Sequence, residues 1–270
     1  MLDNGWKSIS ELRKVDTNYS GMHYSYEYAK ETGLLQYRYC EVSGAVHSVG
    51  VWEEIEICLD SDNGILYRAC ERGHRDYCSK EKFDTQFGVF HNDNRGEFGG
   101  SMLTPAGVCI GGNFREVVNH KRKVYAIDSM NHLGLAHFRL LEFSDAKRYK
   151  EIYSTVDGYL DFLNRDCLQY GALFNTEDAL YFVISGFVVT KNEKYVGHTK
   201  LLKVQNSKVE EIFVVNEEFC WIHSLVVFNN IAYVSMDKMV VSIDLETGIL
   251  GYYTNLSELA ELDLIEIQET

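Results

Sequence analysis

Two cysteines with a histidine midway between them are the densest group of metal-binding side chains in the sequence. Cys70, His74 and Cys78 carry thiol and imidazole groups, which are ligands that zinc prefers. The spacing differs from that of a standard zinc knuckle, and no fourth ligand is apparent. Arg72 and Arg75 would also repel a cation. We therefore predict that this stretch binds no metal.

A second polar cluster resembles a calcium-binding loop. His91, Asn92, Asp93 and Asn94 offer oxygen or nitrogen ligands, and Gly96 and Glu97 follow them. A calcium loop also needs a closing carboxylate at a set distance, and the sequence has none there. We interpret this stretch as a polar turn that leads into the next strand.

The sequence contains none of the common catalytic signatures. It has no Gly-x-Ser-x-Gly elbow, no phosphate-binding glycine loop and no dinucleotide fingerprint. Paired carboxylates can hydrolyse glycosides, and Asp60, Asp157 and Asp237 are candidates for such a pair. Because the chain has 40 acidic residues, this choice is nearly arbitrary. We predict a protein that is not an enzyme and that needs no cofactor.

The elements that would position these residues are β-hairpins. Runs rich in Val, Ile, Leu, Phe and Tyr meet a short polar turn and then a second such run, which is the hairpin signal. The clearest example is MVVSIDLETGILGYY, residues 239–253. The hairpins are predicted at residues 26–39, 55–70, 138–153, 201–215 and 239–253. Residues 71–94 are polar and irregular, which predicts loops.

Four-stranded units recur along the chain, most clearly at residues 171–215 and 224–253. Such recurrence is typical of β-propellers. The chain resembles β-propeller repeat proteins in its outer hairpins, notably KETGLLQYRY (residues 30–39) and LETGILGYY (residues 245–253). The resemblance covers most of the chain and implies an all-β fold, most simply with five blades. A β-sandwich is the competing interpretation.

The chain is predicted to form a single domain over residues 1–270. Pro105 is its one proline, and no linker composition divides it. The first two hairpins are too close for two full blades unless the carboxyl terminus supplies strands. We therefore expect residues 263–268 to close the ring by pairing with the amino-terminal hairpin, which would remove an unpaired edge.

The net charge limits the kinds of partner. The 26 basic residues face 40 acidic ones, which gives a formal charge of −14 and a pI near 5.1. Direct nucleic-acid binding is disfavoured, because it needs a basic stripe and the longest basic cluster is only residues 120–123. An acidic surface favours a cationic partner. The alternative is that the acidity serves only solubility.

The amino terminus has neither the basic start nor the apolar run of a signal peptide, and no stretch approaches the roughly 18 apolar residues of a membrane span. We expect a soluble, cytoplasmic protein with no membrane contact. The seven cysteines are odd in number and scattered, which favours reduced thiols over a disulfide framework.

Binding residues are expected on the connections between propeller blades and between the second and third strands of each blade, since these emerge on one face. Acidic and aromatic residues alternate there, and aromatic anchors with orienting carboxylates suit a protein interface. Ordinary solvated loops are the alternative. The predicted partner-binding residues are Asp157, Tyr159, Asp161, Glu193, Tyr195, Glu217, Glu218 and Trp221.

An acidic, cytoplasmic, single-domain binder without catalytic motifs is similar in character to the immunity proteins that bacteria pair with secreted or contact-delivered nuclease toxins. This resemblance implies a basic nuclease partner whose active site the chain covers. An adaptor protein would have the same character. The alternative class is a propeller that binds carbohydrate or hydrolyses glycosides.

Overall fold

The computed structural model describes residues 5–15, 37–40, 45–48, 53–71, 81–94, 99–132, 135–155, 166–189, 195–219, 222–236 and 239–254. The chain divides into two compact units. One unit combines Met1–Gly73 with Cys220–Thr270, and the other is the continuous stretch His74–Phe219. We call them the terminal unit and the central unit.

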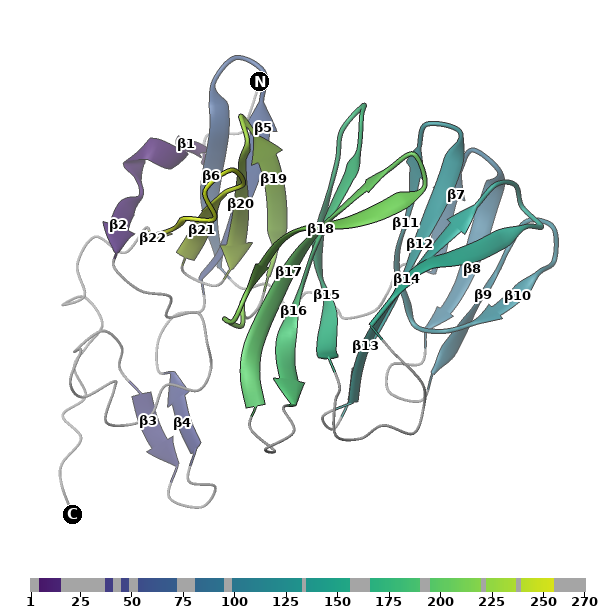
Figure 1. Cartoon of the computed structure of the whole chain (residues 1–270), viewed down its shortest axis with the longest axis horizontal. Helices are drawn as coiled ribbons and strands as arrows, with labels where there is room; N and C mark the ends of the chain where they lie inside the picture. Colours follow the sequence, from purple (N-terminus) through teal and green to yellow (C-terminus); the bar gives the residue numbers. More distant parts are fainter. Residues whose placement is uncertain are drawn as a thin grey trace. The chain divides into compact units, whose positions relative to one another are not determined.

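The central unit contains three four-stranded antiparallel sheets in succession (Figure 1). The first consists of β7 (Lys82–Thr85), β8 (Gly88–Asn94), β9 (Gly100–Leu103) and β10 (Cys109–Gly111). The second consists of β11 (Phe114–His120), β12 (Lys123–His132), β13 (Leu135–Phe143) and β14 (Tyr149–Ser154). The third consists of β15 (Asp166–Asn175), β16 (Leu180–Val189), β17 (Tyr195–Gln205) and β18 (Lys208–Val215). In each sheet, strands that follow one another in sequence are paired.

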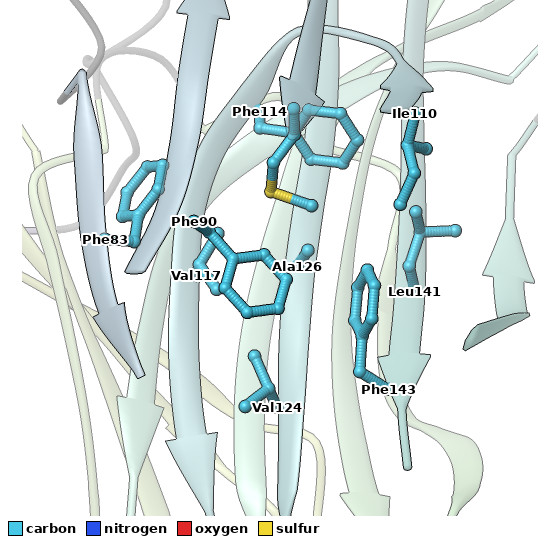
Figure 2. Packing of buried hydrophobic residues seen from close by; sticks show 10 residues of the cluster. Phe83, Phe90, Ile110, Phe114, Val117, Val124, Ala126, Leu141 and Phe143 are labelled. Carbon is cyan, nitrogen blue, oxygen red and sulfur yellow. The ribbon is translucent and has the colours of Figure 1, made fainter. Parts of the chain in front are cut away.

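The second sheet is buried on both faces. One face packs against the first sheet in an aromatic-rich cluster (Figure 2), where the rings of Phe90 and Phe143 meet edge to face with centroids 5.2 Å apart. The other face packs against the third sheet, where Phe138 lies near Phe182. Because side chains alternate between the faces of a strand, Val124 and Ala126 enter the first cluster while Tyr125 and Ile127 enter the second.

Short turns set the register of the paired strands. The β17–β18 turn uses Asn206 and Ser207, both with positive φ, a backbone conformation that two-residue hairpin turns require. The β19–β20 turn uses Asn229 and Asn230 in the same way. Asparagine tolerates the left-handed region better than most residues, so the sequence chemistry of these turns agrees with the observed hairpins.

Buried polar side chains link each sheet to the backbone that follows it. The amide of Asn92, on β8, donates to the carbonyl of Phe114 at 3.0 Å. The hydroxyl of Ser129, on β12, accepts from the backbone N–H of Tyr170 at 2.9 Å. Ser185, on β16, accepts from the backbone N–H of Phe219 at 2.7 Å. All three side chains lie on the second strand of their sheet and are buried, so the contact recurs with the sheets.

The terminal unit combines strands from both ends of the chain. The strands β1 (Lys7–Ser8), β6 (Gly64–Glu71) and β5 (Glu53–Asp60) form a three-stranded sheet, and β3 (Tyr37–Cys40) pairs with β4 (Ala45–Ser48). A five-stranded sheet contains β19 (Ser224–Phe228), β20 (Ile231–Met236), β21 (Met239–Asp244), β22 (Leu250–Thr254) and β2 (Arg13–Val15). A 3-10 helix, η1 (Ile9–Glu11), separates β1 from β2.

The two ends of the chain meet through β2 and β22. Lys14 lies opposite Tyr253 in an antiparallel pair, so an amino-terminal strand covers the edge of the carboxyl-terminal sheet. The same unit repeats the polar link seen in the central unit. The hydroxyl of Ser224 accepts a hydrogen bond from the N–H of Ile57 at 2.9 Å. It is also hydrogen-bonded to the hydroxyl of Ser235, a buried residue on β20, the second strand of the five-stranded sheet.

The all-β prediction is confirmed, as are the hairpins near residues 55–70, 138–153, 201–215 and 239–253. The prediction of loops across residues 71–94 is wrong for residues 82–94, because Phe83, Phe90 and Asn92 face the core of a paired β7–β8 hairpin. Residues 72–80 lie outside the described residues. The hairpin at 26–39 lies mostly outside the described residues, and β3 within it pairs with β4 instead. The closing strand at 263–268 lies wholly outside them, and a closed ring and a single domain stay predictions. Within the described ranges, no helix is long and apolar enough for a membrane crossing.

The polar links can be tested with Ser129→Ala. The substitution removes two hydrogen bonds of a buried hydroxyl, one from the N–H of Tyr170 and one to the carbonyl of His137, and losing such bonds costs about 1 to 3 kcal/mol. We expect the free energy of unfolding, measured by urea denaturation, to fall by about that amount. Ser144→Ala, at an exposed turn position, is the matched control and should change it by less than about 0.5 kcal/mol. Equal effects of the two variants would contradict the structural role of Ser129.

Candidate protein-binding surface

The structure describes three of the eight predicted partner-binding residues. Glu217 and Glu218 follow β18, and Tyr195 begins β17. The other five lie outside the described residues: Asp157, Tyr159, Asp161, Glu193 and Trp221. The geometry of the predicted surface can therefore be followed around the two glutamates.

Two buried hydroxyls hold the backbone on either side of Glu218. The hydroxyl of Thr199 donates to the carbonyl of Glu217 at 2.6 Å, and it also lies 2.7 Å from the hydroxyl of Ser185. The N–H of Phe219 donates to Ser185 at 2.7 Å and to Thr199 at 3.2 Å. Phe219 itself is buried. The segment after β18 is thus fixed at its backbone rather than only at its ends.

Close backbone packing adds to this restraint. A Cβ atom on Gly197 would lie 2.6 Å from the backbone nitrogen of Glu218, so only glycine fits there. Beside Gly197, Nδ1 of His198 lies 3.3 Å from Oδ1 of Asn216. Both glutamates are half-buried and both make further polar interactions. Two adjacent carboxylates on a rigid backbone suit the orientation of a partner's cationic group.

A second polar cluster, centred on Asp128 of β12, was not predicted. Asp128 is fully buried. One carboxylate oxygen, Oδ2, accepts from Nε of Arg139 at 2.6 Å and also pairs with Nη2 of the same guanidinium. The other, Oδ1, accepts from the backbone N–H of Asn113 at 2.6 Å. A Cβ atom on Gly112 would lie 2.8 Å from this carboxylate, so the chain passes directly over it.

The charges in this cluster favour an ionised Asp128. Burial raises the pKa of its carboxyl group, but the nearby imidazole of His137 and guanidinium of Arg139 lower the pKa more, and the result is below its ordinary value. Nε2 of His137 lies 3.3 Å from Oδ1 but does not meet it at a hydrogen-bonding angle. Removing one partner of such a buried ion pair strongly destabilises the folded protein, because the other charge is left buried without compensation.

The cluster contains a serine, an imidazole and a carboxylate, but it is not arranged as a catalytic triad. The hydroxyl of Ser129 donates to the backbone carbonyl of His137 at 3.1 Å and accepts from the N–H of Tyr170. Its proton is therefore directed to a carbonyl and not to the imidazole, as nucleophile activation would require. The arrangement holds the end of the second sheet together and positions Arg139, whose Nη2 also donates to the carbonyl of Gly111 at 2.9 Å.

The remaining chemical candidates have structural roles where they are described. Asp60 accepts from the backbone N–H groups of Asp62 and Asn63 in the β5–β6 turn, while Asp157 and Asp237 lie outside the described residues. Asn92 of the calcium-like stretch links two sheets. No group of three or more His, Cys, Asp and Glu residues in the described part of the chain is placed to hold a metal ion. His74 and Cys78 are not within that part.

One sequence signal would have pointed to the Asp128 cluster. Asp128 follows four apolar or aromatic residues, VYAI, in a strand that is buried on both faces. A charged residue in such a run is rarely buried without a partner. The identity of the partner, Arg139, follows only from the pairing of β12 with β13, in which Asp128 lies opposite Arg139.

The Asp128 ion pair predicts a particular pH dependence of stability. Because its pKa is lowered in the folded protein, Asp128 stabilises the fold above the unfolded-state pKa of about 4, and this contribution is lost as the pH falls through the folded-state pKa. Asp128→Asn should cost about 3 to 5 kcal/mol near pH 7 and progressively less between pH 5 and pH 2, as measured by urea unfolding. Asp84→Asn, at an exposed position of β7, is the control. A cost of Asp128→Asn that is the same at every pH would contradict the role given to the ion pair.

No protein-family model matches the chain, and no curated protein matches it significantly. A proposal about function has to begin from the contacts and charges of this chain itself.

Proposed function

We propose that this chain is a non-enzymatic five-bladed β-propeller that binds a basic protein, and that this partner is a nuclease toxin. The observation that carries the proposal is the distribution of charge between the two units. The terminal unit has 20 acidic and 8 basic residues, whereas the central unit has 20 acidic and 18 basic residues. Nearly all of the net charge of −14 thus belongs to the terminal unit, whereas the proposed contact residues, apart from Trp221, belong to the central unit. In this proposal the terminal unit supplies long-range attraction and the central unit supplies most of the contacts.

Charge that serves only solubility has no reason to be concentrated in one unit. A concentrated negative field attracts a cationic partner from a distance and accelerates its association. Nuclease active sites are lined with Lys and Arg that hold phosphate. Carboxylates on a protein inhibitor can occupy the positions of the substrate's charges, which is how an immunity protein would cover such a site.

The propeller part of the proposal is supported by repetition. Four sheets carry a buried Asn or Ser on their second strand, and each of these side chains, directly or through Ser224, binds backbone beyond its own sheet. In the terminal unit, this link joins the carboxyl-terminal sheet to β5 of the amino-terminal sheet. The pairing of β2 with β22 brings the two chain ends into one sheet, as expected for a ring whose last blade is completed by both termini.

The rigid backbone at Glu217 and Glu218 supports their role in orienting the partner. Preorganised groups lose less conformational entropy on binding than mobile ones. Trp221 follows within three residues of Glu218 and is proposed as the aromatic anchor, since buried aromatic side chains dominate many interfaces. The remaining proposed contacts are Asp157, Tyr159, Asp161, Glu193 and Tyr195.

The proposal is tested first by identifying the partner. The tagged chain is used to capture proteins from an extract of its source cells, and the captured proteins are identified by mass spectrometry. We expect a basic protein whose nuclease activity, measured on RNA and DNA, is suppressed when the purified chain is added. Captured proteins that are not basic, or a nuclease activity that the chain leaves unchanged, would contradict the proposal. Saturable binding on a glycan array would support the carbohydrate alternative in its place.

The proposed surface is tested with the captured partner by kinetic binding measurements. Reversing Glu217 and Glu218 to Lys should slow association by about tenfold, because it removes steering charge beside the interface. Trp221→Ala should instead speed dissociation by about tenfold or more, because it removes a buried anchor. Reversing Glu81 and Asp84 to Lys makes the same change in net charge at another exposed place and serves as the control. If this control slows association as much as the Glu217 and Glu218 variant, the two glutamates have no local role.

A further inference from the structure

A basic patch lies at one end of the second sheet, although the chain as a whole is strongly acidic. Two turns form it. The β11–β12 turn carries Lys121 and Arg122 and leads into Lys123, while the β13–β14 turn carries Lys147 and Arg148 and leads, past Tyr149, to Lys150. Val124 pairs with Phe143 across β12 and β13, so both turns emerge at the same end of the sheet. We call these six cationic residues the turn patch.

Contacts with Glu142 confirm that residues of the two turns come together. Nζ of Lys123 and Nζ of Lys150 lie 2.7 and 3.4 Å from the same oxygen of Glu142. Burial raises the pKa of Glu142, but hydrogen bonds from Lys123, Ser207 and Tyr125 lower it more, so this carboxyl group is held ionised. Asp145 pairs with Arg148 at 2.5 Å, and Glu151 follows Lys150 on β14. Nζ of Lys121 donates to the backbone carbonyl of Asp178, in the neighbouring β15–β16 turn, at 3.1 Å. The six cationic residues thus outnumber these four acidic neighbours, Glu142, Asp145, Glu151 and Asp178.

The backbone of the turn patch is held in place. Oδ1 of Asp145 accepts from the N–H groups of Lys147 and Arg148 at 2.8 and 2.9 Å. The hydroxyl of Thr104 donates to the carbonyl of Ala146 at 2.7 Å and so joins this turn to the first sheet. Lys121 has φ 54°, where the other hairpin turns with positive φ use asparagine, serine or glycine. Such a conformation is unfavourable for a lysine.

Two cations of the turn patch and the aromatic ring of Tyr149 beside them are available for a partner. Arg122 and Lys147 are exposed, and neither makes an ion pair with any residue in the described ranges. Tyr149 is 44% exposed although its ring packs against Phe143, with centroids 5.3 Å apart. Arginine and tyrosine are enriched at protein interfaces, and an exposed lysine adds charge that is complementary to an anionic partner.

We propose that the turn patch binds an acidic polypeptide segment of a partner protein, independently of the basic partner proposed above. Charge complementarity identifies the occupant. A nucleic acid extends far beyond the patch and would meet the field of the whole chain, which is −14. A short acidic peptide senses mainly the charges within a Debye length of roughly 8 Å, where the turn patch is positive. An apolar residue beside the carboxylates would pack on Tyr149.

The probe is a fluorescein-labelled peptide of ten glutamates, and its binding is measured by fluorescence anisotropy. We expect saturable binding in 50 mM NaCl that weakens by about tenfold or more in 300 mM NaCl. Lys147→Glu should weaken binding several-fold, and the double variant Arg122→Glu with Lys147→Glu by about tenfold. Lys82→Glu, an exposed position on β7, makes the same charge change as Lys147→Glu and should leave the dissociation constant within about twofold.

Several results would overturn the proposal. These are an absence of binding in 50 mM NaCl and an equal weakening by Lys82→Glu and Lys147→Glu. A twelve-nucleotide single-stranded DNA that binds more tightly than the peptide, and that loses binding in the double variant, would identify a phosphate-binding surface instead. The variants alter exposed side chains that have no described ion-pair partner, so each should melt at the temperature of the unmodified chain. A lowered melting temperature would exclude that variant, and Lys147→Gln with Arg122→Gln would then replace it.

Discussion

The arrangement of this chain depends on sheet faces that are buried against other parts of the protein. A side chain on a buried face has no access to water, so each polar group there needs a partner inside the protein. Four buried side chains meet this need by hydrogen bonds to backbone outside their own sheet: Asn92, Ser129, Ser185 and Ser235. The bond of Ser235 is made through the hydroxyl of Ser224. Apolar clusters would tolerate small shifts between sheets, whereas these hydrogen bonds permit one register.

The same constraint explains where the unusual chemistry lies. Asp128 and Glu142 are both buried acidic residues of the second sheet, on adjacent strands β12 and β13. Asp128 is held by Arg139, and Glu142 by Lys123 and Tyr125. These two carboxylates lie toward opposite ends of the sheet, because Asp128 pairs with Arg139 and Tyr125 with Glu142 in the β12–β13 register. Each pairs with cationic side chains of the same sheet, so its buried negative charge is compensated inside the protein.

Charge is therefore organised at two levels. Between the units, the excess of acidic residues lies in the terminal unit, and the central unit is almost neutral. Within the central unit, the turn patch concentrates cations at one end of the second sheet. An acidic unit and a separate basic patch are consistent with the two partners of opposite charge that we propose. Neither surface is visible in the net charge alone.

The sequence by itself determined the all-β class and most of the hairpins, because alternating apolar residues and Asn, Asp or Gly turns are local signals. It was insufficient for β7 and β8, where few apolar residues are present and Asn92 is buried by a contact with another sheet. Only the tertiary structure decided that β2 joins β22, that Asp128 meets Arg139, and that Lys121 to Lys123 lie beside Lys147 to Lys150. These neighbours are separated by 11 to 240 residues in sequence, and their contacts depend on strand pairing, which no local pattern records.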